Sequence, residues 1–173
     1  NINIFDGLAT HFMDREYIKI LMETGINAVH YTVAFTTLCH LQNLEDNFEM
    51  ACRSIGRWYR IMEENNDLIE LATSIKSMEE IQKKGKIAIF FGFQNGSPIE
   101  DNLDYLTLFH KMGIRFIMLT YNKRNFIGSG GGESRDTGLS DFGLEVVKKM
   151  NSLGICIDLS HCGDKTSYEA IEA

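Results

Sequence analysis

Polar side chains of the kinds that bind metals and small ligands follow several apolar runs of this sequence. They are Asp6, Gln94-Asn95, Tyr121-Asn122, and Asp158 together with His161. If the apolar runs are strands of a parallel sheet, their carboxyl ends lie at one edge, and these groups gather there. Imidazoles and carboxylates bind metal ions, whereas amides and phenols hydrogen-bond to polar ligands. The pattern therefore predicts a ligand or metal site at the strand mouths.

His161 is the leading single candidate, because it follows an apolar run and has Asp158 three residues before it. The other histidines are weaker candidates. We expect His30 to point into a helix–sheet layer, and His11, His40 and His110 are typical of loop or surface positions. Cys162 beside His161 could suggest a nucleophile, but the side chains of adjacent residues usually point apart.

The elements that would carry these residues repeat one pattern, in which a helix ends at Gly and a strand of β-branched and aromatic residues follows. Glycine suits the left-handed conformation that often ends a helix. The pattern predicts strands after Gly25, Gly85, Gly113 and Gly154, and a first strand over Ile2–Leu8 has no preceding helix. All five are nearly continuous in apolar character, as strands buried on both faces are.

Local signals mark the helices between the strands. Two sequences have the form of capping boxes, Ser97-Pro98-Ile99-Glu100 and Ser77-Met78-Glu79-Glu80. Leu139-Ser140 is expected to open a further helix, and a long helix is expected from Leu44 to Met62. The stretch 67–73 reads as a short extra strand or an extended linker.

Strands that alternate with helices indicate a parallel sheet with right-handed crossovers. Two α/β architectures satisfy this pattern: an open doubly wound sheet, and about the first five βα units of a TIM-type (β/α)8 barrel. Both place a ligand site at the carboxyl ends of the strands.

The Gly-rich stretch Gly128–Glu133 does not have the form of a phosphate-binding loop. It has neither G-x-G-x-x-G spacing nor a Gly-Lys-Ser/Thr sequence, and it does not join a strand directly to a helix. We expect a mobile loop over the strand mouths.

Composition narrows the class of protein. The formal net charge of −7 and the lack of a basic cluster argue against nucleic acid and anionic membranes as partners. No apolar run reaches the roughly 18–20 residues of a membrane span, and residues 1–6 do not resemble a signal peptide.

The four cysteines, Cys39, Cys52, Cys156 and Cys162, show no regular spacing, so we expect reduced thiols and a cytoplasmic protein; a secreted protein with two disulfides is the alternative. The chain lacks an initiating Met and stops within a helical pattern, so we expect a single domain over 1–173 that is a piece of a longer chain.

Three segments together carry a resemblance to a known family: "FFGFQNGSPIEDNLDYL", "GIRFIMLTYNKRN" and "GLSDFGLEVVKKMNSLGICIDLSHCGDKTSYEAIEA". The chain resembles the membrane (renal) dipeptidases, a family of metallopeptidases that are (β/α)8 barrels of the amidohydrolase-like kind. The resemblance implies the barrel architecture. It also implies hydrolysis of a dipeptide or related small amide by metal-activated water.

The resemblance also assigns residues, and here this chain departs from the family. His161 lies where the family has a zinc ligand. Leu8 and Thr10 replace a His and an Asp that bind metal in the first strand, and Gln94 replaces a Glu that bridges two zinc ions. Tyr121 replaces a His that touches substrate. The resemblance therefore implies metal binding by His161, with Gln94 as a doubtful second ligand, and substrate binding by Tyr121, Asn122 and Asn95.

These replacements limit the metal content. Two Zn²⁺ ions 3.5–4 Å apart repel by roughly 15–20 kcal/mol at an effective dielectric near 20, so a dinuclear centre needs anionic bridges that Leu8, Thr10 and Gln94 do not supply. We expect at most one zinc ion.

The alternative function is that of a non-catalytic family member, which binds a small ligand without the dinuclear centre. A different lyase or hydrolase activity on the same barrel is a third candidate function. We further expect a homo-oligomer, or other contacts that cover the open edges of an incomplete barrel.

Overall fold

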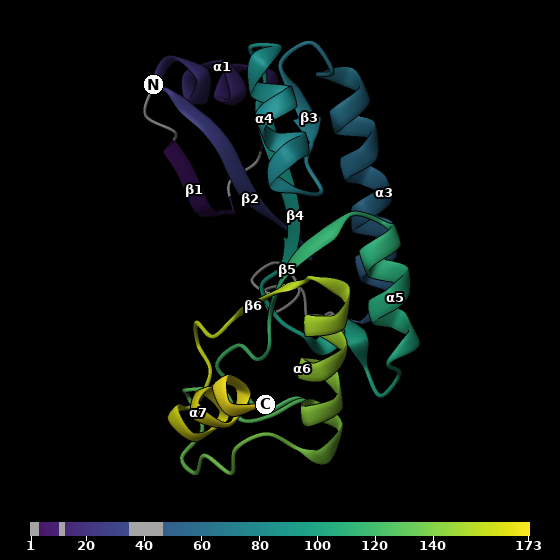
Figure 1. Ribbon diagram of the computed structural model, residues 1–173, viewed down its shortest axis with the longest axis vertical. Helices are drawn as coiled ribbons and strands as arrows, with labels where there is room; N and C mark the ends of the chain where they lie inside the picture. Colours follow the sequence, from purple (N-terminus) through teal and green to yellow (C-terminus); the bar gives the residue numbers. More distant parts are fainter. Residues whose placement is uncertain (1–3, 11–12, 35–46) are drawn as a thin grey trace.

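The computed structural model describes residues 4–10, 13–34 and 47–173, which form a curled parallel sheet with helices (Figure 1). The strands are β1 (Ile4–Ala9), β2 (Ile26–Ala34), β3 (Ile69–Leu71), β4 (Ile87–Phe93), β5 (Ile114–Met118) and β6 (Cys156–Asp158). Five of them pair in the order β1-β2-β4-β5-β6, and every pairing is parallel.

This order follows the chain without a reversal, so the doubly wound alternative is wrong. The fold is the curled half-barrel expected from about five βα units.

The sixth strand is the short β3, at the place where the sequence indicated a strand or linker. It pairs with Ile87–Ile89 of β4, whereas β5 pairs with Phe91–Phe93. Because β2 runs along the other side of β4, β3 and β5 share one edge of that strand. β4 is therefore covered along both edges, and all seven of its residues are buried.

The helices are α1 (Arg15–Glu23), α3 (Phe48–Glu64), α4 (Ile75–Lys83), α5 (Asp104–Lys111), α6 (Asp141–Leu153) and α7 (Asp164–Glu172), with the 3₁₀ turn η1 (Ser97–Ile99). The main core joins residues of α1, α3, α5 and α6 to one face of the sheet, which we call the outer face. A smaller cluster on the opposite, inner face joins Ala28, Ala88 and Phe90 to Ile81 of α4. In Figure 1, α3 and α5 lie along one side of the molecule and α4 crosses in front of β4.

The glycines predicted to end helices have the expected backbone. Gly25, Gly85, Gly113 and Gly154 all have positive φ, from 70° to 93°. The predicted opening of α6 is also confirmed, since Ser140 caps it by accepting a hydrogen bond from Gly143 N.

Both predicted capping boxes are wrong in detail. Ser97–Ile99 is a single 3₁₀ turn without a side-chain cap, and the carboxylate of Glu100 instead accepts from Phe48 N at the start of α3. In α4 the cap is Ser74 rather than Ser77, which occupies the third helical position. In both cases a local motif was read at the wrong register, because several Ser and Glu residues could satisfy the same free N–H groups.

Candidate metal and ligand site at the strand mouths

His161 lies in the turn between β6 and α7. Asp158 begins this turn by accepting a hydrogen bond from Ser160 N at 2.8 Å. The backbone of His161 has φ +59°, a left-handed conformation that is uncommon outside glycine. Its carbonyl accepts a hydrogen bond from Gly131 N at 2.7 Å. The contacts of the turn therefore hold His161 in a backbone geometry that its residue type does not favour.

Three of the predicted site residues come together here: His161, Tyr121 and Asn122. His161 Nδ1 lies 2.9 Å from Asn122 Oδ1, and the ring stacks on Tyr121 with centroids 4.2 Å apart and planes at 21°. Tyr121 and Asn122 come from the segment just after β5, so two neighbouring strand ends supply the group. Nε2 of His161 makes no hydrogen bond to any residue that the structure describes.

Gln94 directly follows β4, two residues beyond Gly92. Its side chain is only 8% exposed, and its Oε1 has no hydrogen-bond partner among the described residues. A buried amide oxygen without a partner is costly, so this atom suits a cation or a ligand N–H.

Asn95 has a different local role. Its Oδ1 accepts hydrogen bonds from Ser97 N at 3.1 Å and from Asn125 Nδ2 at 2.9 Å. Asn125 also donates to Leu119 O, so this pair ties the end of β4 to the end of β5. The Asn95 Nδ2 group makes no hydrogen bond within the described part of the chain and stays available as a donor.

His30 lies on the inner face of the sheet, opposite the main helix–sheet core cluster. It is 2% exposed, its Nδ1 lies 2.8 Å from Gly7 O, and its ring stacks on Phe116. Because a carbonyl only accepts, Nδ1 carries the proton, and the buried Nε2 has no partner among the described residues. Burial lowers the pKa of His30, against the raising effects of the Gly7 hydrogen bond and of the Asp158 and Asp6 carboxylates. Sequence reasoning ranked His30 as a weaker candidate, although its alternation with outward Val29 and Tyr31 could have placed it on the inner face.

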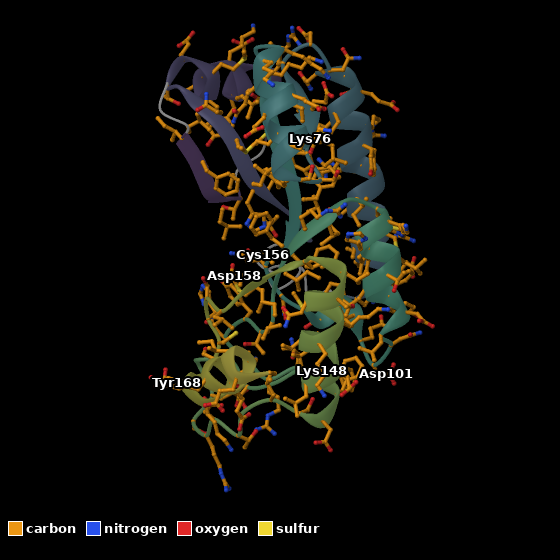
Figure 2. The ribbon with its side chains drawn as sticks, in the orientation of Figure 1. Lys76, Asp101, Lys148, Cys156, Asp158 and Tyr168 are labelled. Carbon is orange, nitrogen blue, oxygen red and sulfur yellow. The ribbon has the colours of Figure 1, made fainter. Side chains whose placement is uncertain are left out.

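Asp158 and Cys156 mark the position of β6 in Figure 2, on the side of the molecule away from α3 and α5.

Burial raises the pKa of the Cys162 thiol, which argues against a nucleophilic thiolate beside His161. Cys52, Cys156 and Cys162 are free thiols.

The Gly-rich stretch is a loop that is bridged to neighbouring segments at two points. Gly128 bridges to Leu139 and Gly130 to Cys162, and both glycines are buried. The stretch thus lies between the β5 and β6 ends, beside the site residues.

The described residues do not by themselves form a metal site. His161 Nε2 and Gln94 Oε1 each keep a lone pair without a partner among the described residues, but these residues contain no group of three or more His, Cys, Asp and Glu side chains that could hold a metal. Further ligands would have to come from residues beyond the described set. Leu8, Thr10 and Gln94 carry no charge, so these three residues supply no anionic bridge between two adjacent ions.

The fold and the site together define a class of protein. Its members have a curled parallel half-barrel with an oriented imidazole at the carboxyl ends of the strands. Within that class, the sequence pattern of the membrane dipeptidases, peptidase family M19, matches residues 11–173. The chain belongs to this family.

Individual relatives agree with this assignment. Dipeptidase tcpJ of Claviceps purpurea (strain 20.1) is 29% identical over 140 residues, which are 80% of this chain and 32% of that protein. The crystal structure of an amidohydrolase from Pseudomonas aeruginosa is similar with a TM-score of 0.90 and 34% identity, over 98% of this chain and 49% of that one. A metallopeptidase from Rhodobacter sphaeroides, liganded with a phosphinate mimic of the dipeptide L-Ala-D-Ala, shares the fold with a TM-score of 0.78 at 16% identity, over 99% of this chain and 62% of that one. The chain thus spans about a third of the curated relative and half to two thirds of these structures.

None of the described helices is long and apolar enough to cross a membrane.

Proposed function

We propose that the full-length protein is a metal-dependent, dipeptidase-like hydrolase that cleaves a dipeptide or related small amide with metal-activated water. The observation that carries the proposal is the geometry of His161, whose Nδ1 is engaged by Asn122 while Nε2 is free. Family membership and the names of the relatives support it.

His161 and the unpartnered oxygen of Gln94 would contribute to holding at most one zinc ion, with the remaining ligands outside the described residues. When bound, such an ion lowers the pKa of a coordinated water and polarises the scissile carbonyl. Tyr121, Asn122 and Asn95 would bind substrate: the Nδ2 groups of both asparagines can donate to substrate oxygens, and the Tyr121 ring lines the approach beside His161. No described residue is assigned as the catalytic acid or base.

We further propose that residues 1–173 belong to one domain, and one core cluster that runs from Ala9 to Ala170 supports this. β1 and β6 end the strand order, and Phe5 on β1 is 43% exposed, so additional chain or a second copy of the protein would cover these edges. A cytoplasmic location remains part of the proposal, supported by the free thiols of the three cysteines that the structure describes.

The test is dipeptide hydrolysis by full-length protein, prepared metal-free and then loaded with zinc. We expect zinc-dependent cleavage that falls at least 100-fold in His161→Gln, whereas His110→Gln on α5 serves as the matched control and keeps full activity. Dipeptide binding without hydrolysis at any zinc loading would instead identify a non-catalytic member of the family, which no comparison favours.

A further inference from the structure

The Gly-rich stretch is the one prominent motif of the sequence that the proposed function leaves unused, and its contacts point to a role. Gly131 N donates to His161 O at 2.7 Å, and Gly132 N donates to Asn122 O at 2.9 Å. Two consecutive amides therefore bind the backbones of the two residues whose side chains meet in the His161–Asn122 hydrogen bond.

We propose that Gly130–Gly132 is a backbone clamp that holds Asn122 beside His161, and that Asn122 is a positioning residue that fixes which imidazole nitrogen is free to bind a metal. The metal-binding part of this inference rests on the proposed function.

The chemistry of the side-chain contact carries the first step. Asn122 Oδ1 is a carbonyl oxygen and can only accept, so His161 Nδ1 must carry the proton. In the neutral ring this leaves the lone pair on Nε2. The stack on Tyr121 fixes the ring plane, so rotation of the ring is restricted as well. An imidazole held through one nitrogen in this way is ordered before the metal arrives.

The close approach of backbones explains why glycines form the clamp. A Cβ on Gly130 would lie 2.2 Å from Tyr121 O and 2.5 Å from Asn122 C, and one on Gly132 would lie 2.7 Å from Asn122 O. Gly130 also bridges to Cys162, next to His161. A side chain at Gly130 or Gly132 would push the 121–122 segment away from the 161–162 segment.

Gly131 supplies a matched control within the same clamp. A Cβ there would meet its nearest atoms, Cys162 O and His161 O, at 3.3 and 3.4 Å, which small shifts can accommodate. Both Gly131 and Asn122 are exposed, so their variants are expected to fold. Asn122→Asp keeps an oxygen acceptor and serves as the conservative rescue of Asn122→Ala.

The experiment uses the full-length protein with histidine labelled by ¹⁵N. The tautomer of His161 is read in the metal-free protein by NMR, assigned with His161→Gln, and zinc affinity is measured by competition with a chelator. We expect Nδ1–H in the unmodified protein, in Gly131→Ala and in Asn122→Asp. We expect mixed tautomers and zinc binding weaker by about 10–100-fold in Asn122→Ala and Gly130→Ala, with chemical denaturation confirming that Asn122→Ala is folded.

An unchanged tautomer and unchanged zinc affinity in Asn122→Ala would overturn the positioning role. Equal zinc affinity in Gly130→Ala and Gly131→Ala would overturn the clamp. If zinc binding of the unmodified protein does not depend on His161, the proposed function fails, while the tautomer measurement still decides the role of Asn122 on its own.

Discussion

At the scale of single residues, the site is built by side chains whose hydrogen-bonding capacity is only partly used. His161, Gln94 and His30 each keep a nitrogen or oxygen without a partner among the described residues, and two of these atoms are buried. Neutral side chains with free lone pairs suit a ligand or one cation and do not suit a pair of cations.

The backbone of His161 gives a direct residue-scale prediction. Because φ is +59°, His161→Gly should be more stable than His161→Ala by about 1 kcal/mol, since glycine adopts this conformation without the Cβ penalty. Chemical denaturation of the two full-length variants in the presence of a chelator measures the difference. Equal stabilities would show that the left-handed conformation is not retained at this position.

His30 predicts a pH dependence. Its pKa is lowered in the folded protein by burial, so the unfolded chain binds more protons once the pH falls below the ordinary value of 6.5. The contribution of His30 to the free energy of unfolding should therefore be fully present above about pH 6.5. The free energy of unfolding should decrease as the pH falls through that value toward the lower folded pKa.

Urea denaturation between pH 7.5 and 5 tests this, with His30→Gln as the variant that should flatten the decline. Burial also lowers the pKa of His110, so His110→Gln is the control that accounts for the remaining slope. A decline of the same size in His30→Gln would exclude His30 as its source.

At the scale of elements, the spacing between β4 and β5 depends on Gly92. A Cβ at this position would lie 2.1 Å from His30 Nε2 and 2.7 Å from Phe116 O, which is backbone and cannot move without moving β5. Glycine in a strand marks such close approaches.

Gly92→Ala should therefore destabilise the full-length protein by about 3 kcal/mol. Gly7→Ala on β1 is the control, because a Cβ there meets nothing within 4 Å, and it should change the free energy of unfolding by less than about 1 kcal/mol. Denaturant titration of both variants provides the comparison. Similar effects of the two substitutions would contradict the tight contact at β4.

At the scale of the whole molecule, we expect the metal content to depend on residues at the carboxyl ends of two strands, β1 and β4. The unmodified full-length protein should bind at most one zinc ion, and Gln94→Glu alone should not add a second, because Leu8 and Thr10 offer neither imidazole nor carboxylate.

The triple variant Leu8→His, Thr10→Asp, Gln94→Glu should raise the stoichiometry toward two, provided that the barrel accepts the new polar groups. Mass spectrometry of purified proteins measures the zinc content. Two tightly bound ions in the unmodified protein would show that other residues supply the missing ligands.

Much of this molecule was determined by its sequence alone. The four helix-ending glycines with the apolar runs behind them, and the first apolar run, predicted five parallel strands, because backbone conformation and burial are local consequences of residue type. The gathering of Tyr121, Asn122 and His161 was also foreseen, because the carboxyl ends of parallel strands meet at one edge.

Only the tertiary structure decided how these groups are used. The tertiary structure places His30 on the inner face, pairs the Glu100 carboxylate with the backbone at the start of α3, and positions Gly130–Gly132 between the backbones of Asn122 and His161. Each of these outcomes depends on a partner that is distant in the sequence, since a free lone pair or a close backbone approach is a property of two segments together. Residue type determines which hydrogen bonds and metal bonds a side chain can form. The packing of neighbouring strands determines which of its polar atoms stay unpaired and free to bind a ligand.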